Sequence, residues 1–353
     1  MQSIAFIFYF CPNKIMNSKK ITIHDIARKL NLTASTVSRA LNNHPKISDA
    51  TKKLVHNAAK ELNYRPNTIA ASLRRGKAKS IGLVIPRINR NFISNTISGI
   101  EKVTSENGYN LLICQSEESL EKEINNLKTL VNNRVDGILI SISLETNTSK
   151  HIKTIINDGI PLVQFDRFRS DIETSKVIND NFQGAYDAVK HLIDKGCKRI
   201  AHFGGADIIS IYAERIEGYK KSLIDNGLEV DPSLIFNKIL NKEEGYKIAN
   251  KIFDSKIKID GIFAASDYSA LGAMLAARER NIKIPEQIAI IGFANEPFTE
   301  FVSPSLSSLD QFGVEMGISA ARLLIEKIES KQKEVIPKTV IIRPKLIIRE
   351  SSK

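Results

Sequence analysis

The chain has 353 residues, of which 42% are hydrophobic and 25% charged, and its formal net charge is +12. This length exceeds one ordinary core and suits two or three domains, and the composition argues against both a disordered chain and a membrane protein. Cys11, Cys114 and Cys197 form no CxxC pair, which argues against a disulfide framework and a thiolate metal site and favours the cytoplasm as the location.

The positive charge is concentrated near the N-terminus. Residues 19–79 contain fourteen lysines and arginines against three acids, whereas the chain from residue 80 onward has 36 of each. A neutral body with one strongly basic end is expected of a protein that binds the phosphate backbone of nucleic acid. A solvated charged surface is the alternative until the motifs are considered.

The first 18 residues differ from the basic region that follows them. Residues 4–10 form an apolar stretch, IAFIFYF, that lacks a basic n-region and is too short to span a bilayer. We expect translation to begin at Met16, so that residues 1–15 come from a misassigned start codon or form a disordered tail. An intact mass that includes Met1 would contradict this expectation.

Residues 21–42, ITIHDIARKLNLTASTVSRALN, predict two short helices joined by a tight turn. Thr22 is placed to cap the first helix, with an acid three residues on, and Asn31 tolerates the positive φ that the turn needs. Thr33 is then a second N-cap, and the apolar residues of the second helix face back toward Ala27. This is the spacing of a helix-turn-helix, although a purely structural helical hairpin would show a similar pattern.

A third helix is expected from its cap, Ser48, to about Asn63. Three helices in about 45 residues without a disulfide make a small core, so this head should be only marginally stable alone. The apolar stripe of the third helix is predicted to consist of Leu54, Ala58, Ala59 and Leu62.

Three consecutive strings resemble the headpiece, hinge and first core strand of the lactose and purine repressor family. They are TIHDIARKLNLTASTVSRALN, ISDATKKLVHNAAKELNYRPN and TIAASLRRGKAKSIGLVIP, and the resemblance continues over nearly the whole chain. It implies a sequence-specific, DNA-binding transcriptional regulator, a repressor, and not an enzyme. Hydroxyl side chains can hold phosphates, and a long arginine can reach the acceptors of a guanine. The expected DNA-binding residues of the head are Thr22, Thr33, Ala34, Ser35, Thr36, Ser38, Arg39, Asn42 and Tyr64.

The resemblance also implies a hinge helix, after the NYRPN motif, that forms only on operator DNA. By position, Leu73 is the apolar residue pushed into the minor groove, with Asn67, Ala70 and Arg74 beside it. Such a wedge unstacks bases and kinks the duplex, which makes DNA deformability part of specificity. A buried helix residue is the alternative interpretation of Leu73.

From residue 80 onward, apolar runs alternate with helical stretches. This rhythm predicts open, doubly wound α/β sheets that bind ligands at the C-terminal ends of their strands. Buried parallel strands are expected at residues 81–85, 110–114, 137–140, 162–165, 200–203, 261–264 and 288–293, and helices at 119–132, 182–195, 213–226 and 268–280.

The resemblance implies that this body has two similar lobes, like those of periplasmic sugar-binding proteins. The chain should cross between them near Ile178, Leu309 and Glu334, and a ligand that touches both lobes can change the angle between them. The expected division is an extension at 1–18, a helix-turn-helix head at 19–66, a hinge helix and linker at 67–79, and an effector-binding and dimerisation core at 80–350, with one lobe at about 80–178 and 310–333 and the other at about 179–309 and 334–350.

Polar and aromatic residues that follow the predicted strands mark a candidate effector site. A paired acid and arginine can bind the hydroxyls of a sugar, while an arginine alone could clamp a carboxylate or a phosphate. By the resemblance, the effector-binding residues are Phe92, Asp166, Arg215, Asp267, Asn295 and Glu296.

Structural roles remain open for several of these residues. Asp267 could be only a helix N-cap, Asp166 and Arg167 could form an ion pair between the lobes, and Phe92 could belong to the core. Many family members have Asp after the strand IAIIGF, whereas this chain has Ala294, so better-known relatives do not indicate its ligand.

The sequence indicates no catalytic residue, metal site or cofactor. Gly204 and Gly205 lack the GxGxxG spacing, and the six histidines are dispersed. A solute-binding receptor for transport would fit the body alone, but it would have no use for a basic helix-turn-helix. An enzyme would need convergent acids and bases that the sequence does not offer.

The expected partners are near-palindromic double-stranded operator DNA, a small molecule and a second copy of the chain. Two-fold DNA requires a two-fold protein, so we expect a homodimer. A carbohydrate is favoured as the effector over a nucleobase. No membrane partner is expected, and the location should be the cytoplasm, at the nucleoid.

Overall fold

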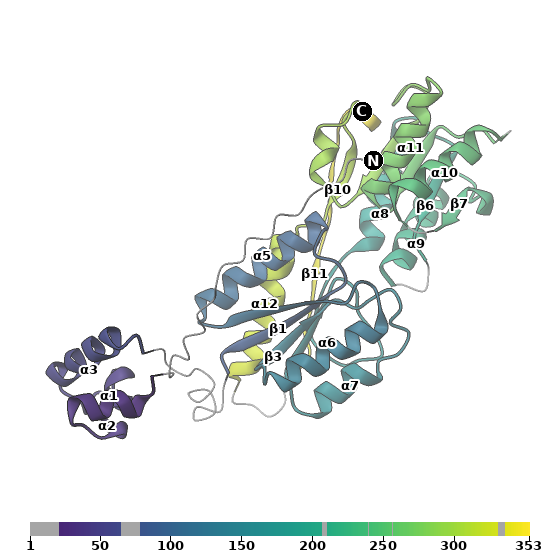
Figure 1. Ribbon diagram of the computed structural model, residues 1–353. Coiled ribbons are helices and arrows are strands. Elements are labelled where there is room, and N and C mark those ends of the chain that lie inside the picture. The colour runs from purple at the N-terminus through teal and green to yellow at the C-terminus, as the bar shows by residue number, and fades with distance from the viewer. Residues whose placement is uncertain (1–20, 65–77, 207–209, 239, 256, 331–335) are drawn as a thin grey trace, which may run out of the picture. The chain divides into compact units, whose positions relative to one another are not determined.

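The computed structural model describes residues 21–64, 78–206, 210–238, 240–255, 257–330 and 336–353. The chain divides into two units, Met1–Gly76 and Lys77–Lys353, here called the head and the body (Figure 1). The extension expected at 1–18 lies outside the described residues. So do the hinge residues Asn67, Ala70, Leu73 and Arg74.

The head consists of three helices, α1 (Ile23–Leu30), α2 (Ala34–Leu41) and α3 (Asp49–Glu61). The predicted capping residues begin each of them. The backbone N–H of Thr22 donates to the Asp25 carboxylate at 2.8 Å, and the hydroxyls of Thr33 and Ser48 accept from backbone N–H groups of the first turns of α2 and α3. Asn31 ends α1 with φ of 53°, as the turn requires.

The core of the head differs from the prediction at one position of α3. Leu54 is 51% exposed, whereas its neighbour Val55 is fully buried. The buried stripe runs through Val55, Ala58, Ala59 and Leu62, which is the i, i+3, i+4, i+7 pattern of a single helix face. The prediction of Leu54 was wrong because Leu54 lies five positions before Ala59 and so falls outside the face that Ala58, Ala59 and Leu62 share. Val55 lies three positions before Ala58 and four before Ala59, which places it on that face.

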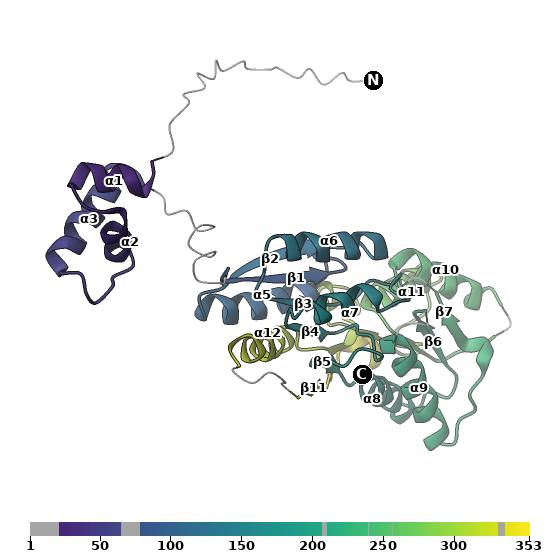
Figure 2. The ribbon, with the colours of Figure 1, turned by 90° about the horizontal axis from the view of Figure 1, so that it is seen from below.

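The first sheet of the body has the strand order β11-β5-β4-β3-β1-β2, and all of its strands are parallel. Together with its helices it forms lobe 1 (Figure 2). The strands are β1 (Ser80–Ile85), β2 (Asn110–Gln115), β3 (Gly137–Ile140), β4 (Leu162–Phe165), β5 (Lys176–Asn179) and β11 (Thr339–Ile342), and the helices are α5 (Asn91–Glu106), α6 (Leu120–Asn132), α7 (Lys150–Asn157) and α12 (Gly313–Glu329).

The second sheet has the order β12-β10-β9-β8-β6-β7 and is parallel except for the edge strand β12, which pairs antiparallel with β10. With its helices it forms lobe 2, and the doubly wound architecture expected of the body is confirmed. The strands are β6 (Ile200–Gly204), β7 (Ile235–Asn237), β8 (Gly261–Ala264), β9 (Ala289–Phe293), β10 (Ser307–Asp310) and β12 (Lys345–Ile347); the helices are α8 (Asn181–Asp194), α9 (Ser210–Asp225), α10 (Lys242–Phe253) and α11 (Asp267–Glu279), with short 3₁₀ helices η1 (Pro232–Leu234), η2 (Pro297–Glu300) and η3 (Glu350–Ser352).

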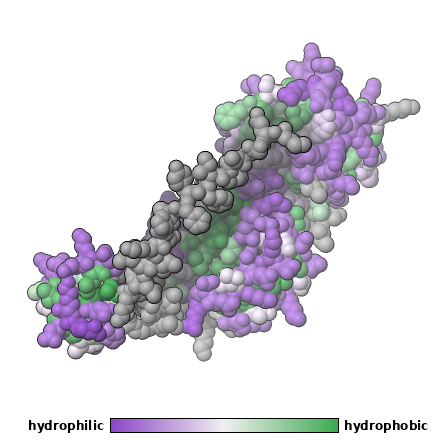
Figure 3. Space-filling view, viewed as in Figure 1, coloured by the Kyte–Doolittle hydropathy of each residue, from purple (hydrophilic) through white to green (hydrophobic). Residues whose placement is uncertain are grey.

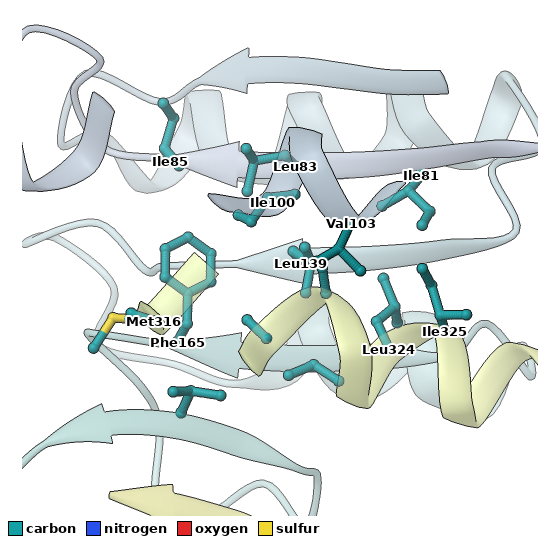
Figure 4. Close-up of a cluster of buried hydrophobic side chains, with 14 of the residues drawn as sticks. Ile81, Leu83, Ile85, Ile100, Val103, Leu139, Phe165, Met316, Leu324 and Ile325 are labelled. Atoms are coloured by element: carbon teal, nitrogen blue, oxygen red, sulfur yellow. The ribbon is translucent and has the colours of Figure 1, made fainter. Parts of the chain in front are cut away.

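Alternate residues of the strands of lobe 1 face two separate cores. Leu83, Leu139 and Phe165 pack under α5 and α12 (Figure 4), whereas Val84 and Ile140 face α6 and α7. The α5 and α12 backbones pass close together, since a Cβ atom on Gly317 would lie 2.0 Å from the carbonyl oxygen of Thr96. No helix in the described part of the chain is long and apolar enough to cross a membrane.

The third crossing between the lobes lies later in the chain than expected. We expected it near Glu334, but β11 completes lobe 1 beside β5, and the chain enters lobe 2 only at β12. Arg343 and Pro344 separate the two strands. Because Pro344 has no N–H group, it cannot continue the ladder of β11, and one extended segment therefore divides into an edge strand for each sheet.

Candidate functional site

A cavity of about 310 Å³ lies between the two lobes, at the carboxyl ends of their strands. Pro86, Glu118 and Asp166 follow strands of lobe 1, and Ala265 and Ala294 follow strands of lobe 2. This is where parallel α/β sheets bind ligands. Of the expected effector-binding residues, the cavity is lined by Phe92, Asp166, Arg215 and Glu296.

Arg215, on α9, is 5% exposed and is held by neutral groups. Its Nε atom donates to Asn181 Oδ1 and its Nη1 atom to the carbonyl oxygen of Ala265, both at 2.9 Å. Its guanidinium lies 3.6 Å above the Phe293 ring. Burial lowers the pKa of Arg215 to about 10, so the side chain stays charged at neutral pH.

The lobe 1 side of the cavity contains a cluster of opposite charges. Arg167 donates from Nη1 to Glu118 at 2.7 Å, and Arg87 Nε lies 3.7 Å from the same carboxylate. Arg167 thus pairs with Glu118 inside lobe 1, and the alternative of an ion pair between lobes formed by Asp166 and Arg167 does not hold. Asp166 accepts from Ser141 Oγ at 3.3 Å, and burial raises the pKa of Asp166 despite the nearby guanidiniums of Arg167 and Arg215.

Two contacts join the lobes beside the cavity. The guanidinium of Arg90, just before α5, lies 4.2 Å from the ring centre of Tyr268 on α11. The Glu296 carboxylate in lobe 2 is also close enough to Arg90 and to the backbone N–H of Asn91, both in lobe 1, for these groups to favour its ionised form. Burial raises the pKa of Glu296, and the charge of Arg90 opposes this shift. Residues that line the cavity therefore also face residues of the opposite lobe.

Asp267 and Asn295 lie behind the cavity wall and do not line it. The fully buried Asp267 carboxylate accepts from the backbone N–H of Glu296 at 2.8 Å and from the hydroxyl of Ser308. It is the first residue of α11, and Ser266 is the cap, so the N-cap alternative for Asp267 does not hold. Burial raises the pKa of Asp267 to about 7.

Asn295 occupies a comparable supporting position. Its side chain donates to Asp310 at 3.2 Å and accepts from Arg349 Nη2 at 3.0 Å. Asp267 and Asn295 hold the Ala294–Glu296 turn in place and present Glu296 to the cavity.

Sequence reasoning missed several residues of the cavity wall. Glu118 and Arg87 follow strands, so the rule that selected Asp166 would have found them. Arg90 and Tyr268 meet only because the two lobes come together. The missed polar and aromatic wall residues are Arg87, Arg90, Glu118, Arg167, Tyr212, Asn241, Ser266, Tyr268, Phe293 and Gln311.

On the head, α2 presents a polar surface. The hydroxyl of Thr33 is 2.8 Å from that of Ser35 and 2.9 Å from that of Thr36. Arg39 is exposed and forms no ion pair within residues 21–64, in contrast to Arg28, which pairs with Asp25. Among the residues expected to bind DNA, Thr22, Thr33, Ser35, Arg39 and Asn42 are exposed, and Ala34, Thr36, Ser38 and Tyr64 are partly buried.

A helix-turn-helix head joined to a two-lobed α/β body with a ligand-sized cavity defines a DNA-binding regulator that responds to a small molecule. Residues 22–67 match the model for bacterial regulatory proteins of the lacI family, and residues 189–352 match a periplasmic binding protein-like domain. The chain is 32% identical over 332 residues to the HTH-type transcriptional repressor PurR of Histophilus somni (strain 2336), covering 94% of this chain and 99% of that protein. The chain belongs to the lacI family of bacterial regulatory proteins.

Solved structures agree with this assignment. The transcriptional regulator CelR in its cellobiose complex is 27% identical with a TM-score of 0.72, covering 94% of this chain and 99% of that one. The lac repressor dimer bound to operator and an anti-inducer has the same fold, with a TM-score of 0.84 at 20% identity over 95% of this chain and 99% of that one. The chain is thus a ligand-controlled transcriptional regulator, and the expectations that it is neither an enzyme nor a transport receptor follow from its family.

Proposed function

We propose that this regulator is a repressor that binds near-palindromic operator DNA as a homodimer, and that a carbohydrate in the cavity between the lobes sets its affinity for DNA. The observation that carries this proposal is the cavity itself, since Arg215 and Glu296 reach it from lobe 2 and Asp166 from lobe 1. A ligand that bonds to both sides stabilises one lobe angle over others, which is the differential affinity that control requires.

The chemistry of the cavity wall suits a carbohydrate. Arg215 offers directed N–H donors, and Asp166, whose pKa is raised by burial, can both donate to and accept from hydroxyl groups when protonated. Phe92 and Phe293 add apolar surface of the kind that packs against a sugar ring. The relative CelR was solved with cellobiose, which supports the same ligand class here.

We further propose that α2 lies in the major groove of the operator. Arg39 would read base edges, while the hydroxyls of Thr33, Ser35 and Thr36, together with Thr22, Asn42 and Tyr64, would contact or orient the backbone. Ala34 and Ser38 would lie nearest the base edges on the same helix. Asn67, Ala70, Leu73 and Arg74 would act in the minor groove as hinge residues. Operator binding would keep the protein in the cytoplasm, at the nucleoid.

The functional division that goes with this proposal is a head at 19–66, a hinge at 67–79 and a core from 80 onward. Effector binding changes the lobe angle and hence the distance between the two hinges of a dimer. Hinge helices that cannot meet in the minor groove lose their order, and operator affinity changes.

Operator selection from a random duplex library, followed by titration against salt, tests the DNA arm. We expect a palindromic consensus and a steep negative slope of log affinity against log salt. Arg39→Ala should lower the preference for the consensus by about 1–3 kcal/mol. Lys60→Ala, which removes one exposed charge from α3, is the matched control and should leave the preference unchanged. A protein that binds all duplexes equally contradicts the proposal.

A thermal-shift screen of the full chain against pentoses, hexoses, uronic acids, sugar phosphates and nucleobases tests the effector arm. A ligand that binds the folded body raises its melting temperature by mass action. A response to nucleobases and to no sugar would reject the carbohydrate assignment and leave the DNA arm intact.

A further inference from the structure

We propose that the effector carries an anionic group, a carboxylate or a phosphate, so that it is a sugar acid or a sugar phosphate and not a neutral sugar. This inference rests on the proposed function of the same cavity and specifies the charge of the ligand. It is drawn from the pairing of the charged side chains on the cavity wall.

The described wall of the cavity has more basic than acidic groups. It has no lysine or histidine, and an excess of one positive charge remains even when every acid is ionised. The four basic residues are Arg87, Arg90, Arg167 and Arg215, and the three acidic residues are Glu118, Asp166 and Glu296.

The acids are distributed unevenly among the arginines. Glu118 alone serves both Arg167, at 2.7 Å, and Arg87, at 3.7 Å. Among the described residues, neither Arg90 nor Arg215 forms an ion pair. Asp166, Glu296 and Glu214, which precedes Arg215 on α9 outside the cavity wall, act on the arginines only at longer range. Burial raises the pKa of all three acids, which weakens their counter-charge.

Arg215 shows the imbalance most clearly. It is nine-tenths buried, yet both of its hydrogen-bond acceptors, Asn181 and the Ala265 carbonyl, are neutral. No described group accepts from its Nη2 atom, which leaves one edge of the guanidinium for a ligand. A buried cation with no anion in direct contact is costly, whereas a charge-assisted hydrogen bond to a ligand anion would stabilise it.

Arg167, on the same wall, also has an unsatisfied donor, which lies beneath the surface. Its Nε atom is buried and has no hydrogen-bond partner in the described structure. Arg90 approaches from lobe 1, and its guanidinium contacts the Tyr268 ring of lobe 2. Guanidinium donors thus reach the cavity from both lobes. A neutral sugar would use some of these donors but would leave their charge uncompensated.

The test compares matched neutral and charged ligands by isothermal titration of the full chain at constant ionic strength. The pairs are glucose with glucuronate and glucose 6-phosphate, galactose with galacturonate, ribose with ribose 5-phosphate, and adenosine with its monophosphate. We expect at least one charged member to bind at least about tenfold more tightly than its neutral partner. The carboxylate and phosphate arms identify which anion the site prefers.

Variants locate the effect. Arg215→Gln should abolish binding of the charged ligand, and Arg90→Gln should weaken it at least about threefold while changing any binding of the neutral partner less. Lys220→Gln removes the same charge from the same helix outside the cavity and should change nothing. Circular dichroism of each variant shows whether a loss reflects unfolding.

Every outcome decides the matter. Neutral sugars that bind as tightly as their acids and phosphates overturn the inference of an anionic effector and leave the carbohydrate assignment intact. Binding of adenosine monophosphate alone supports an anionic effector and rejects the carbohydrate assignment. If no pair binds, the probe is inorganic phosphate against chloride at equal ionic strength: a rise in melting temperature that Arg215→Gln removes supports the inference, and no rise overturns it.

Discussion

The head and the body of this regulator use positive charge in opposite physical settings. Arg39 in the head is exposed and hydrated, whereas Arg215 in the body is buried and held in one orientation by Asn181 and Phe293. Exposed cations suit a polyanion, because each phosphate contact releases counterions and needs little fixed geometry. A buried, oriented guanidinium suits one small ligand, because its donors are already directed.

The two regions also differ in how they are stabilised. The head has a single small cluster of buried apolar side chains around Ile26, Val37 and Val55, while each lobe of the body packs on both faces of its sheet. Hydrophilic residues cover most of the surface of lobe 2 visible in Figure 3. Because the head has the smaller core, we expect it to unfold before the body, as a separate cooperative unit.

The largest expected effect separates the two regions outright. A protein that lacks residues 1–79 should lose operator binding altogether, because it lacks fifteen of the basic side chains and the whole of α2. The same protein should bind the effector with unchanged affinity. Gel-shift and calorimetric titrations measure both quantities, and retention of operator affinity would refute the assignment of DNA binding to the head.

The next effect concerns the body alone. Gly317→Leu should destabilise it by about 3 kcal/mol or more, because the new side chain would collide with the α5 backbone, where even a Cβ would lie 2.0 Å from the Thr96 oxygen. Arg322→Leu, at an exposed position of α12, is the control. Chemical denaturation followed by circular dichroism should show the body transition shifted and the head transition unchanged.

A pH effect should also be confined to the body. Because burial raises the pKa of Asp267 to about 7, the folded body binds a proton between pH 4 and 7 that the unfolded chain does not. Stability contributed by this group is present at low pH and is lost as pH rises through about 7. The free energy of unfolding of Asp267→Asn should therefore be similar to that of the native protein near pH 4. Between pH 4 and pH 7 it should rise relative to the native value by a few kcal/mol.

The comparison between Asp267→Asn and the native protein isolates this effect from other buried groups. Burial lowers the pKa of His202 to about 4, so His202 decreases the stability of the folded body as pH falls, whereas Asp267 increases it. Because His202 is present in both proteins, its effect cancels in the comparison. Asp254→Asn, at an exposed position, should show no such trend. A difference in unfolding free energy that does not vary with pH would show that Asp267 is ionised throughout.

The smallest expected effect tests the core of the head. Val55→Ala should destabilise the head by about 2 kcal/mol, because it removes two buried methyl groups, whereas Leu54→Ala should change stability by less than about 0.5 kcal/mol. Hydrogen exchange of the α3 amides in the full chain measures both. Equal effects of the two substitutions would mean that α3 is rotated from the orientation described here.

The local elements of this protein follow from its sequence. Thr22, Asn31, Thr33 and Ser48 mark helix ends because their hydrogen bonds and backbone angles involve only the next few residues. Most of the buried parallel strands are runs of apolar residues, so strands such as β3 and β8 could be predicted, and with them the architecture of the body. The short strands β5, β7, β11 and β12 are only partly buried and were missed. The strand β10 was missed because it is buried but mostly polar, with the sequence SSLD.

Only the tertiary structure decided which polar residues share the cavity. Asp166 and Asp267 both follow a buried strand, but one lines the cavity and the other supports the turn behind it. The contact of Arg90 with Tyr268 joins residues far apart in the chain, and the crossing at Pro344 depends on which sheet has a free edge. Local patterns determine where helices and strands begin and end, whereas the composition of a site depends on the packing of distant segments, which no short-range rule contains.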